Sequence, residues 1–207
     1  MLRRTWEQLT TLVTGIPSRS EVRRDPWRRL PFEPPLRAFG PGACHDFATY
    51  LTGKTAVPVQ SPTQAAEWLS HCRYASDSEL YDEVDAWLHP ATLELVRSGD
   101  CEDFALWGWR KLVDLGLDAH FVVGMRHRRD GASQRHAWVV YRAEGQVVLF
   151  DGVAGSVTGM LRPLPDVMAD YDPQVGVTPV AARYVFAGLF LSDWGRRLSL
   201  RRSPDLR

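Results

Sequence analysis

The chain has 207 residues, of which 44% are hydrophobic and 24% charged, which is the composition of an ordinary soluble globular protein. A chain of this length buries about 70% of its unfolded surface, so it needs no disulfide or metal to hold it together. Its 25 basic and 25 acidic residues cancel, which argues against a general nucleic-acid-binding protein, whose affinity needs a surplus of cations. Length and charge therefore predict one domain with no nucleic-acid partner.

The cysteine count and the apolar stretches bear on the compartment. Cys44, Cys72 and Cys101 cannot form a closed disulfide set, which suits a reducing compartment or leaves a thiol free for chemistry. The first residues lack an apolar run of signal-peptide length, and the longest apolar stretch near the end, residues 185–191, is too short to cross a bilayer. We expect a cytoplasmic protein with no transmembrane segment.

Positive charge gathers toward both ends of the chain, almost all of it as arginine. Such ends could bind an acidic partner, but solvated termini are the simpler interpretation and the one we favour. We expect an arginine- and proline-rich peripheral segment at 1–42, a folded domain at 43–195 and a basic tail at 196–207.

The first half of the chain predicts three short helices and an extended strap. A helix is expected from Thr5 to Thr14, followed by a proline-dense strap up to residue 42. Residues 61–70 predict a helix capped by Ser61, with Pro62 in its first turn. A third helix is expected at 90–97, ended by Ser98 and Gly99.

The second half predicts a helix followed by antiparallel strands. Apolar or small residues at helical spacing predict one helix over 100–115, which Gly116 ends. Segments rich in β-branched and aromatic residues predict strands at 119–126, 135–143, 146–152 and 184–191. A helix packed on an antiparallel sheet is an α+β architecture.

Cys101 lies at the first turn of the helix at 100–115. The positive end of the helix dipole should stabilise its thiolate and lower the thiol pKa. Unpaired backbone N–H groups at that end could also bind a developing oxyanion. The alternative is that Cys101 is a small buried hydrophobic residue, as free cysteines often are.

His136 favours the chemical interpretation of Cys101. If Glu144 and Gly145 form a two-residue turn, Trp138 lies opposite Asp151 and shares a face with His136. Asp151 is then a diagonal neighbour of His136, about 7–8 Å away at the backbone. It could hold one imidazole nitrogen while the other faces the thiol. Singly, a buried histidine and a turn aspartate are the simpler interpretations, but together with Cys101 we favour a catalytic triad.

Ala105 and Gly108 lie on the same face of the helix as Cys101. A glycine inside a helix costs about 1 kcal/mol relative to alanine, so it usually has a packing reason. We expect these small residues to let the helix approach the sheet that carries His136.

Four segments resemble the transglutaminase-like fold, and specifically the bacterial transglutaminase-like cysteine peptidases: Gly99-Asp-Cys-Glu-Asp-Phe-Ala-Leu, Leu115-Gly-Leu, Arg135-His-Ala-Trp-Val-Val and Val148-Leu-Phe-Asp. The similarity covers about residues 65–155. It implies a papain-like core in which Cys101 is the nucleophile, His136 the base and Asp151 the residue that orients the base. Members of the wider superfamily hydrolyse peptides, deamidate glutamine, transfer acyl groups or cleave glycan–asparagine links, and some are inactive.

The same resemblance implies that Asp100 and Glu102 help to bind calcium in some related peptidases. Calcium needs about 6–8 oxygen ligands, and the sequence does not locate the rest. Asp100 as the N-cap, with Glu102 and Asp103 in the first turn, is the interpretation we favour. Carboxylates beside Cys101 would raise its pKa unless they point away, are neutralised by a cation, or His136 is protonated. No cofactor is required by the triad chemistry, and calcium is the one candidate.

The sequence thus predicts a cysteine peptidase or amidase that acts on a peptide or protein through a thioester. The alternatives are an acyl-transferring enzyme, such as a transglutaminase or arylamine acetyltransferase, and a non-catalytic interaction module. Other polar residues fit structural roles better, among them Cys44-His45-Asp46, Cys72, His120 and His127. Trp87 or Trp138 could form a wall of the cleft.

Overall fold

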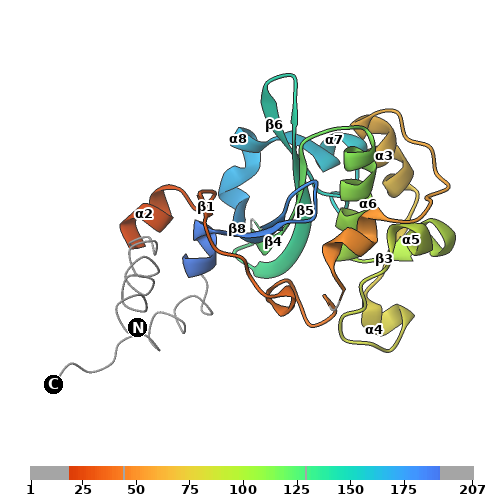
Figure 1. The fold of residues 1–207 in the computed structure, drawn as a ribbon, viewed down its shortest axis with the longest axis horizontal. Coiled ribbons are helices and arrows are strands. Elements are labelled where there is room, and N and C mark those ends of the chain that lie inside the picture. The colour runs from red at the N-terminus through yellow and green to blue at the C-terminus, as the bar shows by residue number, and fades with distance from the viewer. Residues whose placement is uncertain (1–18, 44, 129, 192–207) are drawn as a thin grey trace, which may run out of the picture.

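The structure, a computed structural model, describes residues 19–43, 45–128 and 130–191. In this part of the chain a seven-stranded sheet, antiparallel throughout, runs through the molecule (Figure 1). In spatial order its strands are β1 (Arg29–Leu30), β9 (Arg183–Phe186), β8 (Tyr171–Val177), β4 (Ala119–His127), β5 (Ser133–Ala143), β6 (Gln146–Phe150) and β7 (Leu161–Pro163). Two further strands, β2 (Arg73–Tyr74) and β3 (Ser98–Gly99), form a small parallel pair.

Helices cover both faces of the sheet, with α3, α5 and α6 together on one side and α8 on the other (Figure 1). The α-helices are α2 (Arg19–Arg24), α3 (Pro62–Ser70), α4 (Asp77–Leu80), α5 (Pro90–Val96), α6 (Cys101–Asp114), α7 (Val157–Met160) and α8 (Leu164–Val167). The 3₁₀ helices are η1 (Leu36–Ala38), η2 (Phe47–Leu51), η3 (Met168–Asp170) and η4 (Ala187–Leu191). Helices packed on an antiparallel sheet confirm the predicted α+β class.

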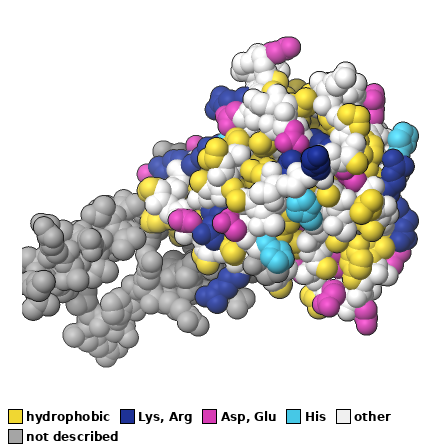
Figure 2. Space-filling model, turned by 45° about the vertical axis from the view of Figure 1, so that its right-hand side comes forward, with side chains coloured by type: hydrophobic (Ala, Val, Ile, Leu, Met, Phe, Trp, Pro, Cys, Tyr) yellow, Lys and Arg dark blue, Asp and Glu magenta, His cyan; other side chains and the backbone are white. Residues whose placement is uncertain are grey.

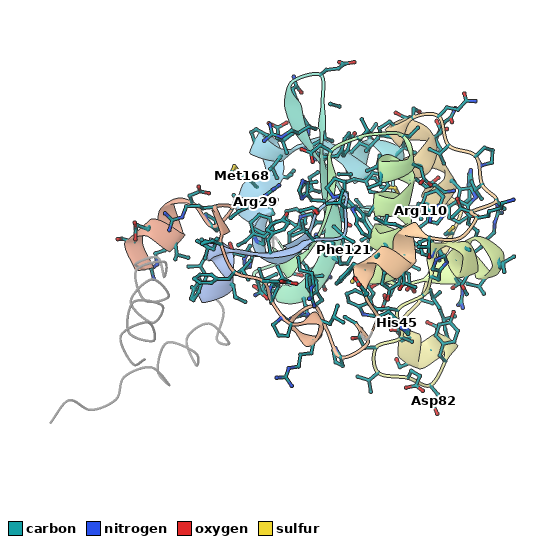
Figure 3. All side chains as sticks on the ribbon, viewed as in Figure 1. Arg29, His45, Asp82, Arg110, Phe121 and Met168 are labelled. Carbon is teal, nitrogen blue, oxygen red and sulfur yellow. The ribbon has the colours of Figure 1, made fainter. Side chains whose placement is uncertain are left out.

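Helix α6 lies at the centre of the core. Asp100 is its N-cap, and Gly116, whose φ of 76° favours glycine, follows its last turn. Sequence periodicity predicts a single apolar face, but side chains all round the helix, Trp107 and Trp109 included, are buried. The reason is that α3 and α5 cover the side of α6 that faces away from the sheet. Phe121 on β4 lies in the same core, near the middle of the view in Figure 3.

Two buried cations fix α6 against the loop that follows η2. Arg110, on the part of the helix labelled in Figure 3, donates to the carbonyl oxygens of Thr52 at 2.7 Å and Gly53 at 3.0 Å. Lys111 donates to the Val57 carbonyl at 2.6 Å and forms an ion pair with Glu94 at 2.8 Å. A rotation of the helix about its axis would break these hydrogen bonds and leave two buried charges without partners, so the bonds fix the orientation of α6.

Gly108 lets α6 approach the sheet, as the sequence predicts. A Cβ atom at this position would lie 2.5 Å from Cε1 of Phe150 on β6, and Phe150 is fully buried. The neighbouring small residue, Ala105, is also buried. The separation between helix and sheet is therefore set by the absence of a side chain at position 108.

Gly108→Ala is expected to destabilise the protein by about 1–3 kcal/mol, although alanine favours helix more than glycine does. The added methyl group must displace the ring of Phe150, which is fully buried. Urea unfolding of the purified variant measures the effect. Gly116→Ala offers a comparison, because no atom lies within 4 Å of a Cβ at that position. Any loss of stability in this variant comes from the positive φ of the backbone and not from a steric clash. A stabilised Gly108→Ala variant would contradict the packing argument.

The sequence predictions of the strands are right for the centre of the sheet and incomplete at its ends. Residues 184–191 do not form one strand, because β9 stops at Phe186 and the chain turns into η4. Strand β8 was not predicted, since Pro173 and Gly176 interrupt its pattern. The expected helix at 5–14 lies outside the described residues. In the expected peripheral segment, β1 joins the edge of the sheet, and Val22 and Phe39 are buried.

The surface carries no long apolar element in the described ranges. None of the helices there is both long enough and apolar enough to span a bilayer. On the face drawn in Figure 2, hydrophobic side chains are scattered among charged and polar ones.

Candidate active site

The thiol of Cys101 lies where the sequence places it, at the first residue of α6. It lines a cavity of about 280 Å³ together with His136 on β5. The walls are completed by Phe39, Gly40, Pro41, Tyr74, Asp85, Trp87, Asp100, Glu102, Val123, Gln134, Arg135 and Ala137. Of the two tryptophans that the sequence offered as a wall of the cleft, Trp87 lines the cavity.

The environment of Cys101 differs from the one predicted. Burial raises the pKa of the Cys101 thiol well above its ordinary value, and the Glu102 and Asp100 carboxyl groups raise it further. The thiol donates a hydrogen bond to Oε2 of Glu102 at 3.1 Å, while the backbone N–H of Ala137 acts in the opposite direction. The expected lowering of the thiol pKa by the helix dipole is therefore outweighed, first by burial and then by the neighbouring carboxyl groups.

His136 and Asp151 are joined by a hydrogen bond. In the β5–β6 hairpin Ala143 pairs with Gln146 and Val139 with Phe150, which is the register predicted from the turn. The Nε2 atom of His136 lies 2.9 Å from Oδ2 of Asp151. Both side chains are buried. Trp138 stacks on the imidazole with ring centroids 6.1 Å apart, so it supports the histidine and does not line the cavity. Because Asp151 contacts Nε2, Nδ1 is the imidazole nitrogen that this carboxylate leaves open.

Two residues that the sequence did not indicate also contact the carboxylate of Asp151. The hydroxyl of Tyr171 donates to Oδ2 at 2.8 Å, and Arg126 forms an ion pair with the same oxygen at 3.0 Å. Burial alone would raise the pKa of Asp151, but His136, Arg126 and Tyr171 together hold it below its ordinary value. Asp151 is therefore a carboxylate with fixed orientation at neutral pH.

Tyr171→Phe is expected to lower the free energy of unfolding by about 1.5–3 kcal/mol, the range for a hydrogen bond to a charged group. The variant keeps the ring and removes only the donor to buried Asp151. Tyr141→Phe is the matched control, since Tyr141 is a buried tyrosine of the cluster on the α6 side of the sheet. Urea unfolding at pH 7 measures both variants. Equal losses in the two would contradict a specific role for the Tyr171 hydroxyl.

Carboxyl groups gather beside Cys101 in a cluster that we call the acidic cluster: Asp77, Asp85, Asp100, Glu102 and Asp103. In each of two groups, Asp77 with Asp85 and Glu102, and Asp77 with Asp100 and Asp103, one oxygen per residue lies within 4.8 Å of the others. Burial raises the pKa of Glu102 to about 10, with Asp100 adding to the shift, and that of Asp103 to about 8.

The acidic cluster has the chemistry of a cation site. Buried Oδ1 atoms of Asp77 and Asp100 have no hydrogen-bond partner among the described residues, and Asp77 is only 2% exposed. Hard oxygen donors in this number suit calcium, and Asp77, Asp85 and Asp103 are candidates for the ligands that the sequence could not locate. The predicted capping role is also present, because Asp103 accepts a hydrogen bond from the Asp100 backbone N–H at 3.3 Å.

The other polar residues take structural positions. Cys44 lies outside the described residues, and Asp46 caps η2 by accepting from the Ala48 N–H. Burial raises the pKa of the Cys72 thiol to about 11. His120 and His127, for which the sequence also favours structural roles, each contact an aspartate. His120 contacts Asp118 at 2.9 Å and the hydroxyl of Tyr184, while His127 contacts Asp172 at 2.8 Å and Ser133.

The core thus has the arrangement expected of a transglutaminase-like fold. A central helix bears the cysteine and packs on an antiparallel sheet that bears the histidine and the aspartate.

Comparisons with known proteins show likeness of fold only. No family model and no curated protein matches the sequence. Legionella pneumophila LapG is 16% identical, with a TM-score of 0.48 over 76% of this chain and 86% of that chain. Its calcium-bound form is 16% identical, with a TM-score of 0.47 over 67% and 75%. An arylamine N-acetyltransferase from Bacillus cereus, which has a Cys-His-Glu catalytic triad, is 17% identical, with a TM-score of 0.41 over 57% and 51%. With every TM-score below 0.5, the roles proposed for the residues rest on the side-chain geometry.

Proposed function

We propose that the protein is a cysteine hydrolase, a peptidase or amidase that cleaves an amide bond in a peptide or protein through a thioester on Cys101. The observation that carries this proposal is that Cys101 lines one cavity with His136, whose Nε2 is held by Asp151 at 2.9 Å. A nucleophile, a base and a group that orients the base are the parts that this chemistry requires.

The proposed reaction has two halves. In the first, Nδ1 of His136 takes the proton of the Cys101 thiol, and the sulfur attacks the carbonyl carbon of the amide. The carbon–nitrogen bond then breaks, and the imidazole gives the proton to the leaving amine. In the second, His136 takes a proton from water, the hydroxide attacks the thioester, and the acid leaves as the thiol is restored. Asp151 acts as a positioning residue throughout, because its carboxylate fixes the ring and stabilises the imidazolium.

Calcium is proposed to bind at the acidic cluster, with Asp77, Asp85, Asp100, Glu102 and Asp103 as the candidate ligands. The ion would supply positive charge that offsets the carboxylates next to the thiol. Glu102 now accepts the hydrogen bond of the Cys101 thiol, and a carboxylate engaged elsewhere would no longer favour the neutral thiol. The proposed compartment is a reducing one, which the free thiols of Cys72 and Cys101 support.

A peptide library derived from a whole proteome tests the function without knowledge of the substrate. The wild-type protein, with calcium chloride, is expected to create new peptide termini that mass spectrometry identifies, and Cys101→Ala is expected to create none. Addition of a primary alkylamine separates hydrolysis from acyl transfer, since transfer yields the alkylamide in place of the free acid. Termini that persist in Cys101→Ala would overturn the proposal, and so would a library left uncut by the wild type.

A further inference from the structure

A second cavity adjoins the one at Cys101. It measures about 320 Å³ and is lined by Pro35, Arg37, Ala38, Arg135, Gln174 and Leu189. The side chain of Arg135 lines both cavities, and the next residue along β5 is His136. A peptide bound with its reacting carbonyl at Cys101 can therefore place a nearby side chain in the second cavity, on the other side of Arg135.

Gln174 reaches this cavity because β8 contains a β-bulge. In the pairing of β8 with β4, Val175 lies opposite Val123 and Pro173 opposite Gly124, so Gln174 is the extra residue. Bulges redirect a side chain and are frequent beside functional sites. At the partner position, a Cβ on Gly124 would lie within 2.2 Å of the Asp172 carbonyl oxygen, so glycine is required there.

The side-chain amide of Gln174 makes no hydrogen bond to the described residues and lines the second cavity. The residue is only 6% exposed. Side-chain amides with little exposure normally hydrogen-bond to the protein or to ordered water. The Gln174 amide therefore leaves its donor and acceptor groups open to a polar group of a ligand in the cavity.

Charge decides which polar group fits. Arg37 and Arg135 bring two guanidinium groups to the second cavity, whereas the cavity at Cys101 contains carboxyl groups, Glu102 among them. One nitrogen of Arg135 donates to the Ala38 carbonyl at 2.8 Å, which anchors the side chain while other N–H groups remain for a ligand. Arg37 is exposed and forms no ion pair with any described residue. The two guanidinium groups therefore attract an anion to the second cavity.

We propose that the second cavity binds the side-chain carboxylate of an acidic residue in the peptide substrate, close to the bond that is cleaved. The Gln174 amide and the guanidinium groups of Arg37 and Arg135 donate hydrogen bonds to it, and Pro35, Ala38 and Leu189 contact the methylene groups. The assignment rests on the proposed hydrolase function for its role in catalysis, but the binding site itself can be tested separately.

Binding is tested with two blocked peptides, acetyl-Ala-Glu-Ala-amide and acetyl-Ala-Gln-Ala-amide, titrated into ¹⁵N-labelled protein. The glutamate peptide is expected to shift the side-chain amide signals of Gln174 saturably, with an affinity about tenfold higher than that of the glutamine peptide. Arg37→Glu is expected to abolish this difference. Arg162→Glu, which reverses an exposed arginine on β7 at the opposite edge of the sheet, should leave it unchanged. Equal affinities, or no saturable shift, would overturn the site.

Cleavage of the proteome-derived library supplies the second measurement. Cleavage that depends on Cys101 is expected to favour Glu or Asp at one fixed position near the cut, and Gln174→Leu and Arg37→Glu should each lower that preference about tenfold. If the peptides bind but nothing is cut, the hydrolase function fails and the carboxylate site stands. If the library is cut without acidic preference, the role of this cavity in substrate recognition is overturned, and the hydrolase function stands.

Discussion

His136→Ala is expected to lower the rate at which iodoacetamide alkylates Cys101 at pH 7 by about a hundredfold or more, within the range by which a positioned base accelerates proton transfer. The physical reason is that the thiol is neutral at rest. Burial and the carboxyl groups of Glu102 and Asp100 raise its pKa, and the helix dipole does not compensate. The sulfur therefore depends on the imidazole to take its proton, and removal of the imidazole leaves a thiol beside carboxyl groups.

Mass spectrometry of the alkylated protein measures this rate at Cys101 and at Cys72 in the same sample. His127→Ala is the matched control, because His127 also binds an aspartate, with Nε2 2.8 Å from Asp172, but does not line the cavity at Cys101. Alkylation of Cys72 should stay slow in every variant, since burial raises its pKa to about 11. If His127→Ala slowed Cys101 as much as His136→Ala, or if neither did, the pairing of thiol and imidazole would be refuted.

Without a cation, the stability of the protein is expected to fall as the pH rises from 6 to 8. The pKa of Glu102 is about 10 and that of Asp103 about 8 in the folded protein, both above the ordinary values. Between these two pKa values the folded state binds more protons than the unfolded state. The contribution of the two carboxyl groups to stability is therefore complete below their ordinary pKa and is lost as the pH rises toward their pKa in the folded protein. The slope is at most about 1.4 kcal/mol per pH unit for each carboxyl group.

Calcium should reverse this trend, because the proposed site would bind it through the charged carboxylates of the acidic cluster. At a concentration one hundred times its dissociation constant it would add about 2.7 kcal/mol of stability. Urea unfolding at several pH values, with either EDTA or calcium chloride, measures both effects. Asp77→Asn should remove most of the gain from calcium, whereas Asp166→Asn, an exposed aspartate of α8, should not. A gain that survives in Asp77→Asn would place the ion elsewhere.

Local patterns in the sequence predicted the parts of the site that are close in the chain. The hairpin turn at Glu144 and Gly145 fixed the register, and with it the approach of His136 to Asp151, which are 15 residues apart. Helix periodicity and capping located Cys101 at the start of α6, and Gly108 indicated close packing against the sheet. These features depend on turn chemistry and on spacing, which a single sequence contains.

Residues that join the site from distant segments could not be predicted in this way. Tyr171 belongs to β8, whose proline and glycine hide the alternation of a strand, so its contact with Asp151 leaves no local signal. Asp77 lies on a four-residue helix remote in sequence from Glu102. For the same reason the helix dipole alone mispredicted the pKa of Cys101, since the shift depends first on how deeply the thiol is buried and then on the carboxyl groups around it.

The order of the site residues along the chain has a consequence for biosynthesis. A ribosome releases Cys101 first, then the hairpin with His136 and Asp151, and Tyr171 only afterwards. The hairpin pair can form as soon as its own turn closes, but the sulfur meets the imidazole only when α6 docks against the finished sheet. A nascent chain therefore carries Cys101 before its proposed base, and the proposed reaction would become available to neighbouring polypeptides only after translation of the whole sheet.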